Sequence, residues 1–221
     1  MKNTSKKLLE KTKEIWEEYY THPFTMGIAD ETLDIEKFKF YMIQDYLYLI
    51  DYAKVFALGV AKSDDMQAAK RFAKALDLIY NGEMDIHRGY MKRLGISLEE
   101  AENTPVAIDN ASYTSYMLKV AYEQGIAEIA VAILSCAVSY EYIARNIVKN
   151  NPDSVNNEFY GEWIRGYAND EYAAENRELE ELVDKLAADY TEEQTENLID
   201  IFVKCSRYEK MFWDMSWEMK L

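Results

Sequence analysis

The chain has 221 residues, of which 40 are Asp or Glu and 25 are Lys or Arg, so its formal net charge is −15. Such a charge repels nucleic-acid phosphates and anionic lipid, which makes both poor partners. The two cysteines are too few for a disulfide framework, and the first twenty residues lack the apolar core of a signal peptide. The longest apolar run, Ile129–Leu134, is far shorter than the ~18 residues of a membrane span. We therefore expect a cytoplasmic protein with no membrane-spanning segment.

The distribution of helix breakers and apolar residues predicts an all-α chain. Gly and Pro are scarce, and no segment alternates as a strand does. The predicted helices cover Ser5–Thr21, a segment from a cap at Asp34 to Lys62, a segment from a cap at Asp64 to Leu94 before Gly95, a short stretch after Ser97, Val106–Gln124, Ile126–Asn150, Val155–Tyr167, Asn169–Asp189 and Thr191–Met219. Short connections and the absence of a linker predict one helical bundle over residues 1–221.

The predicted helix that follows Asp34 contains a carboxylate inside an apolar stretch. In IQDYLYLIDYAK, Asp45 interrupts the apolar run from Phe38 to Leu49 and shares a helix face with Tyr48. By composition alone, Asp45 either faces solvent or makes a hydrogen bond between packed helices. Tyrosine is also unusually frequent, with 18 Tyr against 8 Phe, and suits positions that are apolar but need a hydroxyl.

Two further segments carry pairs of large apolar or aromatic residues at helical spacing. Tyr113 and Met117 lie four residues apart in YTSYM, and Trp163 and Tyr167 lie four apart in WIRGYA. For each segment taken alone, core packing is the default interpretation.

The last predicted helix places a second carboxylate among aromatic residues. Glu209 lies four residues after Cys205, three before Phe212 and four before Trp213. One interpretation is a Glu at the edge of the apolar stripe that pairs with Arg207 or Lys210. The other is a desolvated Glu that serves as a general acid or base.

The most apolar segment, AVAILSCAVSYEY, holds Cys136 at its centre. A free cysteine is more often buried filler than a nucleophile. Cys136 is about ten residues past Gly125, so no helix N-terminus activates it, and no Lys or Arg lies within one turn. A reactive thiol at this position would need a partner from another helix, and Tyr140 is one turn away on the same face.

Taken together, these segments resemble the TenA family, also called thiaminase II or aminopyrimidine aminohydrolase. The resemblance covers nearly the whole chain and is carried by five motifs in order: QDYLYL at 44–49, YTSYM at 113–117, SCAVSYEY at 135–142, WIRGYA at 163–168 and YEKMFW at 208–213. It implies a heme-oxygenase-like helical bundle, a homotetramer and no cofactor. The implied reaction is hydrolysis of the C–N bond between the methylene of a 4-amino-2-methylpyrimidine and its leaving nitrogen. The substrate is thiamine or aminomethyl-aminopyrimidine, and the product is hydroxymethylpyrimidine for thiamine salvage.

The resemblance also implies a role for each matching residue. Cys136 corresponds to the nucleophile that adds to the pyrimidine, Glu209 to its acidic partner, and Asp45 to the carboxylate that pairs with the amino group and nitrogen of the ring. The ring is fixed by aromatic side chains, which correspond to Tyr48, Tyr113, Tyr140, Tyr167 and Phe212. Because a carboxylate beside a sulfur disfavours a thiolate, we expect Cys136 to be a neutral thiol at rest.

The sequence departs from the family pattern beside the nucleophile. Ser135 stands where Pro is frequent and Ala137 where an aromatic residue is frequent, and Ala168 stands where Gly is frequent after Tyr167. These changes alter the wall of the implied pocket without removing a chemical group.

Two other classes of function remain open. A non-catalytic pyrimidine-binding or regulatory protein would keep the same motifs without turnover. A metal or heme oxidase of the same fold is disfavoured, because the only histidines, His22 and His87, lie in no Glu-x-x-His motif. Glu83 and His87 are four residues apart and could bind one metal weakly, although a structural hydrogen bond or an exposed pair is the better interpretation, so we expect no metal site.

Overall fold

The computed structural model describes residues 3–221, and every regular element in that range is helical. The all-α prediction is thus confirmed. The contacts divide the chain into two compact units, of which one contains Met1–Asp34 and Ala130–Trp213 and the other contains Ile35–Ile129 and Asp214–Leu221. The expectation that residues 1–221 form a single domain stays a prediction.

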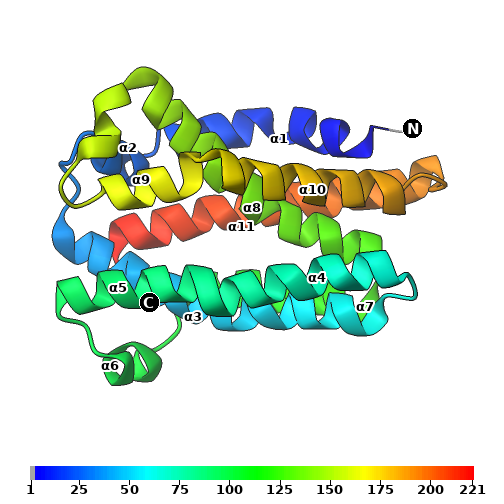
Figure 1. Cartoon of the computed structure of the whole chain (residues 1–221), viewed down its shortest axis with the longest axis horizontal. Helices are drawn as coiled ribbons and strands as arrows, with labels where there is room; N and C mark the ends of the chain where they lie inside the picture. The colour runs from blue at the N-terminus through cyan, green and yellow to red at the C-terminus, as the bar shows by residue number, and fades with distance from the viewer. Residues whose placement is uncertain (1–2) are drawn as a thin grey trace. The chain divides into compact units, whose positions relative to one another are not determined.

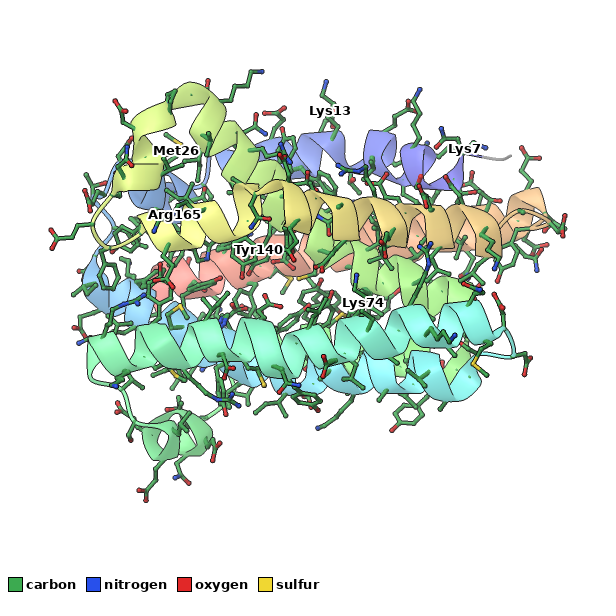
Figure 2. All side chains as sticks on the ribbon, viewed as in Figure 1. Lys7, Lys13, Met26, Lys74, Tyr140 and Arg165 are labelled. Carbon is green, nitrogen blue, oxygen red and sulfur yellow. The ribbon has the colours of Figure 1, made fainter. Side chains whose placement is uncertain are left out.

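The first unit is built from helices of both chain ends. It contains α1 (Thr4–Tyr20), α2 (Pro23–Ala29), most of α8 (Ile126–Asn150), the 3-10 helix η2 (Pro152–Asn156), α9 (Gly161–Ala168), α10 (Asp170–Leu186) and most of α11 (Glu192–Glu218). Helices α1 and α10 lie side by side (Figure 1). Ser5 joins them, because its N–H and hydroxyl both donate to the carboxylate of Asp184, at 2.8 and 3.0 Å. The exposed Lys7 and Lys13 of α1 point outward (Figure 2).

The second unit is organised by one long helix, α3 (Ile35–Lys62). Its other elements are α4 (Met66–Leu78), the π-helical segment η1 (Ile79–Glu83), α5 (Met84–Leu94), α6 (Leu98–Asn103) and α7 (Ile108–Glu123). Helix α3 contacts each of these elements. Gln44 of α3 fixes the start of α7, because its side chain donates to the carbonyl of Pro105 and accepts from the N–H of Ala107, both at 2.9 Å.

Helix α8 is the most apolar element. Among the described residues it alone has the length and composition to cross a membrane, but 78% of its apolar window is buried inside the protein. Ile129 to Ser135 are all fully shielded from solvent. The helix therefore has the burial of a core helix, and it holds Cys136 within the protein interior.

Several helix boundaries follow from local sequence signals. The predicted helix Ile126–Asn150 matches α8 at both ends. Gly95 ends α5 in the left-handed conformation, with φ of 74°. The hydroxyl of Ser97 caps α6, and Thr191 and Gln194 form a reciprocal capping box before α11, with distances of 2.8 and 3.2 Å.

Three local predictions are wrong. The segment predicted as one helix from a cap at Asp64 to Leu94 begins after Asp65, whose side chain accepts from the N–H of Gln67, and η1 interrupts it. The predicted helices also leave out α2, whose first residue is Pro23, a position where the missing N–H of proline costs nothing. The predicted helix Val155–Tyr167 is replaced by η2 and α9.

Tertiary hydrogen bonds explain the break between η2 and α9. The side chain of Asn157 donates to the carbonyl of Ile28, and the hydroxyl of Tyr160 donates to the carbonyl of Leu33. The chain also folds back so closely that a Cβ on Gly161 would lie 2.6 Å from the carbonyl oxygen of Val155. A continuous helix would lose these contacts, so helical periodicity alone could not predict the break.

Candidate active site

The eight predicted site residues fall into two groups, one in each compact unit. The first unit holds Cys136, Tyr140, Tyr167, Glu209 and Phe212. The second unit holds Asp45, Tyr48 and Tyr113. All of them except Tyr167 are buried.

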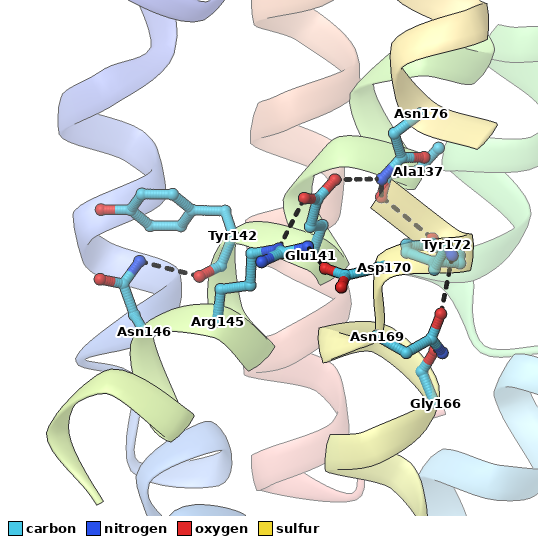
Figure 3. A network of polar contacts seen from close by, with 10 residues as sticks. All are labelled: Ala137, Glu141, Tyr142, Arg145, Asn146, Gly166, Asn169, Asp170, Tyr172 and Asn176. Carbon is cyan, nitrogen blue, oxygen red and sulfur yellow. Dashed lines mark hydrogen bonds and ion pairs between the residues drawn. The ribbon is translucent and has the colours of Figure 1, made fainter. Parts of the chain in front are cut away.

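Polar contacts fix the turn of α8 that begins at Cys136, which is 8% exposed. The carbonyl of Ala137 accepts hydrogen bonds from Tyr172 and Asn176 of α10, at 3.0 and 3.2 Å (Figure 3). The hydroxyl of Ser139 donates to the carbonyl of Cys136 at 2.8 Å. Because both backbone carbonyls carry a side-chain donor, this turn of α8 has a defined position against α10.

An ion-pair network continues from this turn toward solvent. Glu141 accepts from Asn176 and from Arg145, both at 2.8 Å, and Arg145 also reaches Asp170 at 3.2 Å (Figure 3). Arg145 is 43% exposed and Asp170 fully exposed, so their pairing adds little stability. The half-buried Glu141–Asn176 contact ties α8 to α10.

Ser135, one of the departures from the family pattern, makes a buried link to α11. Its hydroxyl lies 3.0 Å from the hydroxyl of Ser206, which also accepts from the indole N–H of Trp16 at 3.3 Å. Ser135 and Ser206 are fully buried. Ser206 thereby joins α1, α8 and α11, the helix that carries Glu209.

Tyr19 is a further candidate residue of the first group, and sequence reasoning missed it. Its hydroxyl donates to the backbone carbonyl of Ser206, and the residue is fully buried. Burial raises the pKa of Tyr19 most, the charge of Glu209 raises it further, and Cys205 and Cys136 add to the rise, while the hydrogen bond to Ser206 lowers it. Tyr19 therefore remains a protonated hydroxyl within electrostatic reach of both predicted catalytic residues. The signal in the sequence was its helical spacing from Trp16 on one face of α1.

Glu209 lies in the interior and not at the edge of the apolar stripe. Glu209 is 2% exposed, and its Oε2 atom is shielded from solvent. Burial, followed by the charge of Glu209, raises the pKa of Cys205, which is fully buried one turn earlier. Of the two interpretations that the sequence left open, the structure supports the desolvated carboxylate.

Aromatic rings surround Tyr140 on α8 (labelled in Figure 2). Its ring centroid lies 4.7 Å from that of Tyr167, 5.4 Å from Trp213 and 5.9 Å from Trp163. Trp163 and Tyr167 also touch each other at 5.0 Å, as their spacing predicted. Phe212 is 2% exposed on α11. The first group thus combines a thiol, a carboxylate, a tyrosine hydroxyl and a set of aromatic rings.

In the second unit, Asp45 makes a hydrogen bond between packed helices, one of the two alternatives. Its Oδ2 lies 2.7 Å from Nε2 of His87 on α5, and both residues are at most 3% exposed. Nδ1 of His87 lies 2.9 Å from the backbone carbonyl oxygen of Glu83. The predicted pairing of Glu83 with His87 is therefore a structural hydrogen bond through the backbone, and sequence reasoning missed the role of Asp45 as partner.

Tyr48 and Tyr113 of the same unit pack together. Their ring centroids are 5.3 Å apart, and Tyr48 also stacks on Tyr52 at 5.1 Å. The hydroxyl of Tyr48 lies 3.8 Å from the sulfur of Met117, the length of a weak hydrogen bond. These contacts join α3 to α7 and give the second group its own aromatic surface.

The described residues offer no metal centre. Within residues 3–221, no three His, Cys, Asp or Glu side chains are arranged to hold a metal ion. His22 has a local role instead, because its Nδ1 accepts from the N–H of Phe24 at 3.1 Å and caps α2.

Comparison with known proteins identifies the class. The model of the TENA/THI-4/PQQC family matches residues 9–219, so the chain belongs to this family and the resemblance seen in the motifs is confirmed. The aminopyrimidine aminohydrolase of Halalkalibacterium halodurans is 44% identical over 97% of this chain and 95% of its own length. The enzyme of that name from Helicobacter pylori is 42% identical over 97% and 98%.

Solved structures agree on the fold. The TenA homologue of P. horikoshii OT3 superposes with a TM-score of 0.87 at 28% identity and covers 97% of this chain and 98% of its own. A domain from Shewanella denitrificans described as having a heme oxygenase-like fold has a TM-score of 0.74 at 14% identity, over 97% and 92% of the two chains. The heme-oxygenase-like prediction is thus confirmed.

Proposed function

We propose that this protein is an aminopyrimidine aminohydrolase that hydrolyses the C–N bond between the methylene of a 4-amino-2-methylpyrimidine and its leaving nitrogen. The observation that carries the proposal is that Cys136 and Glu209 are both buried in the first unit, where the charges of both raise the pKa of the buried Tyr19. Support comes from relatives named for this activity, which match the chain over nearly their whole length. The product is hydroxymethylpyrimidine, which suits thiamine salvage.

In the proposed mechanism, the sulfur of Cys136 attacks the pyrimidine ring. Glu209 takes the thiol proton as the bond forms, since a buried carboxylate accepts a proton more readily than an exposed one. The addition places negative charge on a ring nitrogen, where hydrogen-bond donors stabilise it. The leaving nitrogen departs from the methylene with the bonding electron pair, and an amine takes the proton held by Glu209 as it leaves. Water then adds to the methylene and gives a proton to Glu209, and the sulfur recovers this proton as it is released.

The aromatic residues and Asp45 bind the substrate in this proposal. Tyr48, Tyr113, Tyr140, Tyr167 and Phe212 supply the aromatic rings. Asp45 pairs with the amino group and nitrogen of the pyrimidine. Amines and nitrogen heterocycles that carry this pyrimidine, including thiamine, form the proposed substrate class.

The proposed state of the protein is a cytoplasmic homotetramer that uses no cofactor and has no nucleic-acid or membrane partner. The net charge of −15 supports the exclusion of polyanionic partners. Light scattering coupled to size exclusion tests the tetramer, and a mass other than four times the 25.8 kDa chain contradicts it.

The test of the function is release of hydroxymethylpyrimidine, measured by chromatography, from thiamine and from aminomethyl-aminopyrimidine in parallel. We expect release from at least one substrate, a loss on the order of 10²-fold or more in Cys136→Ser, and retained turnover in Cys205→Ser as the matched control. The faster substrate then defines the physiological class. No release from either substrate, or full turnover in Cys136→Ser, overturns the proposal, and binding without turnover favours the non-catalytic alternative.

A further inference from the structure

The pairing of Asp45 with His87 determines how many protons the pair carries. Nε2 of His87 faces a carboxyl oxygen of Asp45 at 2.7 Å, and Nδ1 faces the carbonyl oxygen of Glu83 at 2.9 Å. A carbonyl only accepts hydrogen bonds, and so does an ionised carboxylate. Each ring nitrogen therefore needs a hydrogen if Asp45 is ionised, which makes His87 an imidazolium.

A neutral histidine beside an ionised Asp45 does not fit this geometry. With its hydrogen on Nδ1, the lone pair of Nε2 would face the carboxylate; with its hydrogen on Nε2, the lone pair of Nδ1 would face the carbonyl of Glu83. The remaining possibility is a neutral ring that accepts from a protonated Asp45. In either arrangement the buried pair holds one proton more than a neutral imidazole and a carboxylate would.

The surroundings of His87 favour the imidazolium. Burial lowers the pKa of His87, but the hydrogen bond and charge of Asp45 outweigh it, and Glu83 adds to the rise, so the net pKa is raised. Asp45 comes from α3, and Glu83 ends the π-helical segment that precedes α5. These two are the charged groups that act on the ring.

The π-helical segment sets the direction of His87. A π turn adds one residue to the helix, which rotates every later side chain by about 100° around the axis. His87 is buried, whereas its neighbours Ile86 and Arg88 are exposed. Because η1 ends at Glu83, one turn before His87, it places this residue and not a neighbour toward α3. Such segments are frequent at functional sites.

We propose that His87 is a positioning residue that holds Asp45 through one oxygen and supplies the proton that Asp45 passes to the substrate ring. This inference rests on the proposed function. As the sulfur of Cys136 bonds to a ring carbon and its proton moves to Glu209, the electron pair of the attacked double bond moves to a ring nitrogen. Asp45 takes the Nε2 proton of His87 and passes a proton to that nitrogen. When the sulfur leaves again, the proton returns along the same path.

The proton count is tested by nitrogen NMR of the substrate-free protein labelled at histidine. Only two histidines contribute. We expect hydrogens on both ring nitrogens of His87 at pH 7.5. Nδ1 of His22 accepts a hydrogen bond and therefore carries no hydrogen, so its signal is the internal reference for an unprotonated ring nitrogen. A proton found on the Asp45 carboxyl instead also supports a stored proton. A neutral His87 beside an ionised Asp45 overturns the inference.

Turnover separates proton supply from a merely structural role. His87→Gln keeps an N–H donor toward Asp45 but carries no acidic proton. We expect kcat to fall on the order of 10²-fold, with KM changed less than about threefold. His22→Asn, which retains a capping side chain, should keep wild-type kcat. Wild-type kcat in His87→Gln overturns this inference alone, whereas a wild-type protein that releases no hydroxymethylpyrimidine overturns the proposed function as well.

Discussion

The buried hydroxyl of Ser206 offers a direct test of how α1, α8 and α11 are held together. Ser206→Ala removes the acceptor of the Trp16 indole N–H and the partner of the Ser135 hydroxyl. Each of the two buried polar groups left without a partner costs about 1–3 kcal/mol, so we expect the free energy of unfolding to fall by about 2–6 kcal/mol. For a chain of this length, the melting temperature should fall by about 4–24 °C.

The matched control is Ser139→Ala. Ser139 is also a fully buried helical serine, but its hydroxyl donates only to the carbonyl of Cys136 in its own helix. Helix propensity changes equally in both variants, and no group of another helix loses a partner at Ser139. Denaturant unfolding of the two variants should therefore differ by at least about 1.5 kcal/mol. Equal stability would refute the idea that Ser206 joins the three helices.

Three other predictions concern stability. Because the pKa of His87 is raised in the folded state, its charge stabilises the fold fully at pH values below the ordinary histidine pKa of about 6.5, and this contribution is lost as pH rises through the folded pKa. The difference in free energy of unfolding between wild type and His87→Gln should therefore shrink from pH 5.5 to 9, and a difference that grows contradicts the pairing. Gly59→Ala places a Cβ 2.7 Å from the Phe72 ring and should lower the free energy of unfolding by about 1–3 kcal/mol. Gly89→Ala, whose Cβ meets open space, should raise it by about 0.5–1 kcal/mol. Calorimetry that shows changes of the same sign for both variants contradicts this packing. Thr191→Ala removes half of the capping box and should lower the free energy of unfolding by about 1 kcal/mol in urea, and no change would mean that α11 frays there.

The sequence by itself determined those features that depend on neighbouring residues. The all-α class, the ends of α8, the cap at Ser97 and the box at Thr191 follow from apolar spacing and local hydrogen-bonding side chains. The order of five motifs was sufficient to identify the family. These signals are readable because a helix is built from contacts within about four residues.

Only the tertiary structure decided which side chains meet across helices. The same spacing would allow Asp45 to face solvent or Glu209 to lie at an edge. It placed Tyr19 on a helix face but did not show that Tyr19 lies within electrostatic reach of Glu209, or that His87 pairs with Asp45. It also predicted a helix across Gly161, where hydrogen bonds to distant backbone carbonyls favour a break. The physical reason is that burial and hydrogen-bond partners depend on the rotation of one helix against another, and a single extra residue such as that of η1 changes this rotation by about 100°.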